Sequence, residues 1–162
     1  MSIDFSADNV LSIAQQIERN GAQFYRVAAD YSCAVDVRRM LLDLASMEDD
    51  HEKTFTKLRG KLTADEKQPT VFDPDSQEAA YLRTMADSNV FNPRVDPAER
   101  LTGDESLDEI LRTAIGLEKD SVVFYQGLKM VVPKRLGGKK LDNIIEEEMR
   151  HIALLSDKLA SL

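Results

Sequence analysis

Cysteine and long apolar runs are scarce in this sequence, and their scarcity excludes several classes of protein. Cys33 is the only cysteine among 162 residues, so a single chain forms no internal disulfide and no metal site built on several thiolates. No stretch approaches the roughly 20 apolar residues that a membrane-spanning helix needs. The first residues lack both the basic start and the apolar core of a signal peptide. We therefore expect a cytoplasmic protein with no membrane partner.

Basic residues are also in the minority. The 21 lysines and arginines face 29 aspartates and glutamates, which gives a net charge of −8 and a pI near 4.8. Nucleic acid is an improbable partner, because binding to phosphates requires a basic surface. Tryptophan is absent, and only 5 prolines and 7 glycines occur. The abundance of good helix formers favours helices over strands, and the length suits a single domain spanning 1–162.

Apolar residues recur at alternating steps of three and four positions in four segments, which predicts four helices. We place them at about 6–30, 35–60, 106–131 and 134–160, although Gly137 and Gly138 leave the start of the last one uncertain. Short links near Cys33 and Pro133 predict two antiparallel hairpins. The segment 61–105 then forms a long crossover with a short helix at about 75–87. The predicted fold class is all-α, a four-helix bundle.

The sequence repeats a set of polar residues at an interval of 100 positions. Ile-Glu and, seven positions on, Phe-Tyr recur as Leu-Glu and Phe-Tyr, and both histidines follow a glutamate by three positions. The repeated candidate ligands are Glu18, Glu48 and His51 in the first half, and Glu118, Glu148 and His151 in the second. One Glu-x-x-His pair alone is more often a solvated helix face. Two pairs with matched spacing favour a metal site.

The spacing also places the candidate ligands at one level of the bundle. Glu18 and Glu48 are each 15 residues from Cys33, and the repeated glutamates are each 15 residues from Pro133. A helix rises ~1.5 Å per residue, so these side chains lie ~22 Å from the turns. We therefore expect four carboxylates and two imidazoles to converge in one layer.

Four buried carboxylates require positive charge nearby. The predicted inward positions contain no lysine or arginine, whereas two divalent cations would balance four carboxylates and leave neutral imidazoles as donors. Mixed oxygen and nitrogen ligands suit iron or manganese, and zinc can occupy such a site as well. The composition of the layer thus predicts a dinuclear site.

The same ligand set characterises ferritin-like di-iron and di-manganese carboxylate proteins, and the chain resembles the rubrerythrin family of that superfamily over its whole length. The resemblance implies two iron ions, with Glu48 and Glu148 as bridging ligands, Glu18 and Glu118 as terminal ligands, and His51 and His151 each on one iron. It also implies a homodimer that reacts with peroxide or dioxygen in oxidative-stress defence or iron handling.

Two departures from rubrerythrins bear on the reaction. Rubrerythrins carry a rubredoxin-like domain with four cysteines, and with only Cys33 this sequence lacks it, so the electron donor is expected to be external. Rubrerythrins also have a further ligand glutamate where this chain has Ser121. An iron-binding or storage protein without sustained turnover is therefore one alternative. A metal-free helical adaptor with acidic surface residues is another.

Residues beside the candidate ligands have less specific expected roles. Tyr25 and Tyr125 are expected to be core residues with satisfied hydroxyls, and the alternatives are donation to the metal ligands or a place on an electron path. Most flanking acids should be solvated, with one or two orienting a ligand histidine; these are Asp49, Asp50, Glu52, Glu146 and Glu147. The methionines at 40, 47, 130 and 149 are expected to fill the core rather than to bind haem or copper.

Overall fold

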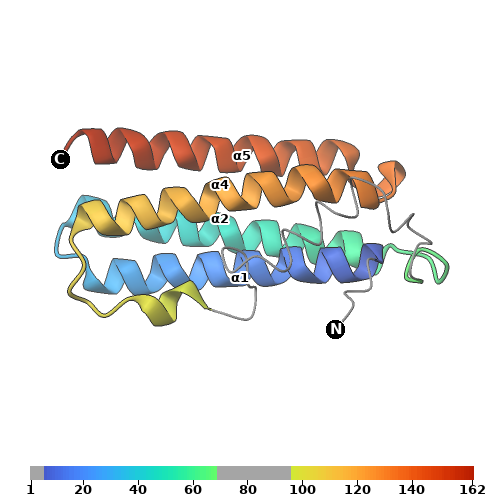
Figure 1. Ribbon diagram of the computed structural model, residues 1–162, viewed down its shortest axis with the longest axis horizontal. Coiled ribbons are helices and arrows are strands. Elements are labelled where there is room, and N and C mark those ends of the chain that lie inside the picture. Colours follow the sequence, from blue (N-terminus) through green and yellow to red (C-terminus); the bar gives the residue numbers. More distant parts are fainter. Residues whose placement is uncertain (1–5, 69–95) are drawn as a thin grey trace, which may run out of the picture.

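The computed structural model describes residues 6–68 and 96–162, which form four long helices and one short 3-10 helix (Figure 1). The elements are α1 (Ala7–Tyr31), α2 (Val35–Gly60), η1 (Pro97–Arg100), α4 (Leu107–Val131) and α5 (Lys134–Ala160). The described residues include no strand, so the predicted all-α class is confirmed. Each long helix begins and ends within one residue of its expected range. The short helix expected at about 75–87 lies outside the described residues.

Serine side chains start two of the helices. The Ser6 hydroxyl accepts a hydrogen bond from the backbone N–H of Asn9 at the start of α1. Ser106 and Glu109 form a reciprocal capping box at the start of α4, with the Ser106 hydroxyl accepting from the N–H of Glu109 at 3.2 Å and Glu109 accepting from the N–H of Ser106 at 2.8 Å. These contacts satisfy N–H groups that have no partner within the helix.

The helix α5 runs through Gly137 and Gly138 without a break. Gly137 is buried, and a Cβ atom there would lie 2.9 Å from Cγ1 of Val132 and 3.0 Å from Cδ1 of Leu141. Glycine at 137 therefore lets the start of α5 pack closely against the turn that precedes it. Gly138 has no atom within 4 Å of the corresponding position.

Alanine substitutions at these neighbouring glycines should have effects of opposite sign. Gly137→Ala should destabilise the protein by about 1–3 kcal/mol, because overpacking outweighs the better helix propensity. Gly138→Ala should stabilise it by up to about 1 kcal/mol, because only the propensity changes. Urea unfolding followed by circular dichroism measures both. Equal effects at the two positions would contradict the close packing at Gly137.

The four long helices form an elongated bundle of two hairpins (Figure 1). α1 packs extensively against α2, and α4 against α5, whereas the contacts of α1 with α4 and of α2 with α5 are sparser. The short helix η1 packs against α1. Among the described residues, no helix combines the length and apolar character that a membrane span requires.

The apolar core consists of two clusters at different levels of the bundle. One cluster contains Leu11 of α1, Phe55 of α2 and Leu128 of α4, and the other contains Ala28, Leu41 and Leu111 of the same three helices. Every candidate ligand lies between these levels in its own helix, and all six are at most 3% exposed. A buried polar layer thus separates two apolar halves, as expected from the equal spacing of the glutamates from the two turns.

Candidate metal centre

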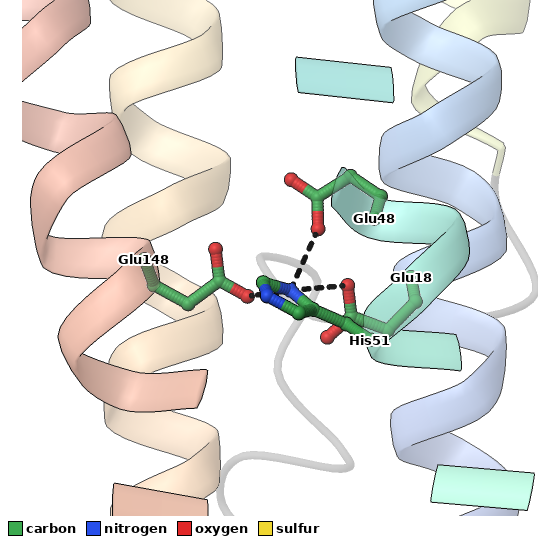
Figure 2. A group of neighbouring side chains, drawn as sticks. All are labelled: Glu18, Glu48, His51 and Glu148. Carbon is green, nitrogen blue, oxygen red and sulfur yellow. Dashed lines mark ion pairs between the residues drawn. The ribbon is translucent and has the colours of Figure 1, made fainter. Parts of the chain in front are cut away.

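The structure brings all six candidate ligands together in two overlapping groups. Glu18, Glu48, His51 and Glu148 offer four ligand atoms within 4.8 Å of one another, and Glu48, Glu118, Glu148 and His151 do the same. Figure 2 shows the first group, in which the His51 ring lies between two glutamates of one hairpin and Glu148 of the other. Each group therefore draws on both hairpins.

Glu48 and Glu148 belong to both groups and extend one oxygen toward each histidine. The Glu148 oxygens lie 3.1 Å from Nδ1 of His51 and 3.0 Å from Nδ1 of His151. The corresponding distances for Glu48 are 3.4 and 3.5 Å. Such a placement suits two carboxylates that each span a pair of cations. Glu18 and Glu118 each approach one histidine only, at 3.5 and 3.4 Å.

The tyrosines connect the two hairpins within this layer. The hydroxyl of Tyr25 in α1 donates a hydrogen bond to Glu118 in α4, and the hydroxyl of Tyr125 in α4 donates to Glu18 in α1. Both rings are buried, as expected for core residues. Beyond the expected core role, each hydroxyl donates a hydrogen bond to a candidate ligand. The partner lies 93 or 107 residues away, so no local sequence signal identifies it.

Burial and mutual repulsion determine the proton affinities of the layer. Burial, together with the charges of Glu48 and Glu148, raises the pKa values of Glu18 and Glu118 well above the usual range. Burial alone lowers the pKa of an imidazole, but the surrounding carboxylates outweigh it. They raise the pKa of His51 far above its ordinary value and that of His151 to about 12. Without metal, the layer therefore holds protons as its counter-charges.

The carboxylate oxygens and imidazole nitrogens of the layer are arranged to coordinate cations rather than to form hydrogen bonds with one another. Within the described part of the chain, both oxygens of Glu148 and Nδ1 of both histidines are buried without a hydrogen-bond partner. The Nδ1 atoms lie within 3.0–3.5 Å of carboxylate oxygens, yet none of these contacts has hydrogen-bond geometry. No lysine or arginine is among the buried residues described. Unsatisfied oxygen and nitrogen donors around a common point fit divalent metal ions.

The second ring nitrogen distinguishes the two histidines. Nε2 of His51 lies 2.7 Å from a carboxylate oxygen of Glu147, a contact that orients the ring and directs Nδ1 toward the layer. Glu147 is one of the flanking acids expected from the sequence to orient a ligand histidine. Nε2 of His151 is buried and has no hydrogen-bond partner among the described residues.

The expectation that the four methionines fill the core is wrong for three of them. Met47, Met130 and Met149 are 37%, 55% and 57% exposed, and Met40 is half-buried. The expectation failed because it rested on the apolar character of methionine alone. The sequence did not show which faces of the helices stay exposed to solvent after the helices pack.

One comparison with known proteins, that with solved structures, agrees with this architecture. No protein-family model matches the chain, and no curated protein sequence matches it. A solved structure is similar over nearly its whole length, that of a Thermotoga maritima protein provisionally assigned as a ferritin-like diiron-carboxylate protein. The TM-score is 0.71 at 24% identity, with 99% of this chain and 98% of that chain covered. The chain has the ferritin-like fold. In this ferritin-like bundle, both Glu-x-x-His pairs face the interior, as the repeat predicted.

Removing either tyrosine hydroxyl should destabilise the metal-free protein without changing its fold. Tyr25→Phe or Tyr125→Phe leaves a buried carboxyl group with one hydrogen bond fewer, which should cost about 1–3 kcal/mol. Tyr31→Phe is the matched control, because Tyr31 is 46% exposed. Urea unfolding after treatment with a chelator measures the three variants. An effect of Tyr31→Phe as large as the other two would contradict the role of the hydroxyls.

Proposed function

We propose that this chain is a di-iron carboxylate protein that reacts with peroxide or dioxygen, as rubrerythrin-like oxidoreductases do. The observation that carries the proposal is the sharing of Glu48 and Glu148 between the two groups of donor atoms. A single ion would not use eight donor positions around two centres, whereas two ions joined by shared carboxylates would. The assignment of the similar Thermotoga maritima structure as a diiron-carboxylate protein is consistent with this proposal.

The proposed ligands are the six residues of the layer. Glu18 and His51 would hold one ion, Glu118 and His151 the other, and Glu48 and Glu148 both. When bound, a pair of ferrous ions supplies two electrons to an oxidant. Manganese or zinc would fit the same donors without necessarily supporting that reaction.

The protein contributes fixed positions and controlled protonation. The hydroxyls of Tyr25 and Tyr125 hold the terminal carboxylates from the opposite hairpin. Burial and the nearby glutamates raise the pKa values of both tyrosines well above their usual range, so the hydroxyls remain protonated donors. The apolar clusters on both sides exclude bulk water from the layer. Such an environment strengthens interactions between the carboxylates and any bound cation.

Ser121 favours the six-ligand set over a rubrerythrin-type set with an additional glutamate. Its hydroxyl donates to the backbone carbonyl of Leu117, one turn earlier in α4. Gly21 is at the corresponding place in α1, where a Cβ atom would lie 3.5 Å from Cγ of Glu48. Neither position supplies a further carboxylate. This observation gives weight to the second candidate function, iron binding or storage without sustained turnover.

Anaerobic loading with ferrous ion, followed by addition of peroxide or dioxygen, tests the proposal. We expect two irons per chain by metal analysis, and an absorption change on oxidation that is faster with peroxide than with dioxygen. Repeated turnover with an external reductant would identify an oxidoreductase. A single round of oxidation would favour storage, and a stoichiometry well below two would contradict the dinuclear centre.

A further inference from the structure

A surface pocket includes His151 in its lining, the residue whose Nε2 is buried without a hydrogen-bond partner among the described residues. It lies between α2 and α5 and has a volume of about 880 Å³, within the usual range for small-molecule sites. Its apolar lining includes Val35, Met40, Leu44, Met47 and Leu154, and His151 is the candidate metal ligand that it reaches.

The internal repeat shows what is missing at His151. His51 and His151 are 100 positions apart, and so are Met47 and Glu147. Glu147 of α5 provides the carboxylate for Nε2 of His51 at 2.7 Å. The repeat places Met47 of α2 in the corresponding position beside His151, and Met47 lines the same pocket. A methionine cannot replace a carboxylate as a hydrogen-bond acceptor, so Nε2 of His151 remains without a partner in the described structure.

The ring of His151 is oriented so that a ligand in the pocket could form a hydrogen bond with Nε2. Its Nδ1 faces the carboxylates of Glu48, Glu118 and Glu148, and Nε2, one ring carbon away from Nδ1, has no hydrogen-bond partner among the described residues. The side chain is only 3% exposed, whereas Met47 is 37% exposed. Methionine is flexible and adapts to different neighbours, so movement of Met47 can open the nitrogen to the pocket.

We propose that this pocket binds a small amphipathic carboxylate, whose carboxylate pairs with Nε2 of His151 and whose apolar part lies against Met47 and Leu154. The chemical class follows from the chain itself, because Glu147 shows which group satisfies the equivalent nitrogen of His51. The charged side chains that line the pocket have no net charge and so do not repel an anion. They are two aspartates and two arginines: Asp36, Arg39, Asp43 and Arg150. The proposal requires no bound metal and therefore stands independently of the proposed function.

Calorimetric titration of the purified protein with hexanoate tests the site, with hexanol as the uncharged analogue. We expect one hexanoate per chain, and hexanol should bind about tenfold more weakly, as the loss of one charge-assisted hydrogen bond predicts. Met47→Glu supplies the missing carboxylate from the protein and should weaken hexanoate binding by about tenfold or more. Met130→Glu makes the same change at an exposed methionine outside the pocket and should leave binding unchanged.

Nitrogen-15 NMR of the histidine rings provides a readout that does not depend on activity. In zinc-loaded protein, hexanoate should shift the Nε2 signal of His151 and leave that of His51 unchanged. Metal analysis of the same samples separates a failure of this proposal from a failure of the metal centre. The carboxylate site would be contradicted by any of three results: no binding of hexanoate, equally tight binding of hexanol, or equal effects of the two glutamate variants. A wild-type dimer that Met47→Glu dissociates would contradict it as well, because a second copy would then occupy the pocket.

Discussion

Saturation with manganese(II) should raise the melting temperature of the metal-free protein by about 15–30 °C. A ligand at about 1,000 times its dissociation constant stabilises the folded state by about 4 kcal/mol per site. Two sites therefore add about 8 kcal/mol, and each kcal/mol shifts the melting temperature of a chain of this size by about 2–4 °C. The gain is large because the cations displace the protons of the layer and coordinate buried oxygen and nitrogen atoms that have no hydrogen-bond partner without metal.

Glu148→Gln should remove most of this gain while preserving the fold. Glu148 is fully buried and belongs to both groups of donor atoms, so its loss weakens both sites. The metal-free variant should fold but be less stable than the parent, because the two protonated imidazoles then face one buried carboxylate charge fewer. Glu146→Gln, the same change at an exposed residue two positions away, is the control. Differential scanning calorimetry with and without manganese measures all three proteins, and an undiminished gain in Glu148→Gln would rule out Glu148 as a ligand.

Metal binding should release close to four protons per chain at pH 6. In the metal-free layer, Glu18, Glu118, His51 and His151 all have raised pKa values, so each holds a proton there. Ligands bind metal in their deprotonated forms, and two divalent cations replace four positive charges. Because the raised pKa values favour protons over metal as the pH falls, the affinity should rise with pH. Two protons displaced per ion correspond to about a hundredfold change in each dissociation constant per pH unit.

Titration of the weakly buffered protein with zinc or manganese in a pH-stat counts the protons directly. The same titration of Glu148→Gln should release fewer, because fewer ions bind. Release of fewer than one proton per chain from the parent protein, together with full metal occupancy, would show that the metal-free layer is not held neutral by protons.

The sequence alone placed the helices and the candidate ligands, because both leave local, periodic signals. The apolar steps of three and four located each helix end to within one residue, including the one after Pro133. Burial between two apolar clusters then agreed with the count of 15 residues from each turn. The role of Gly137 in close packing was not visible in the sequence, because it depends on the distance to Val132 in the preceding turn.

Contacts across the bundle were decided by the tertiary structure. The bonds from Tyr25 to Glu118 and from Tyr125 to Glu18 join residues about a hundred positions apart, and their pairing follows from how the hairpins dock. Likewise, Glu147 and Met47 are at equivalent positions of the repeat. Only the packing of α2 against α5 shows that Glu147 contacts a histidine whereas Met47 borders a pocket. The sequence by itself determined which groups face inward, because helical phase is a local property. Which of these groups meet was settled by the packing of the two hairpins, because that depends on side chains from all four helices at once.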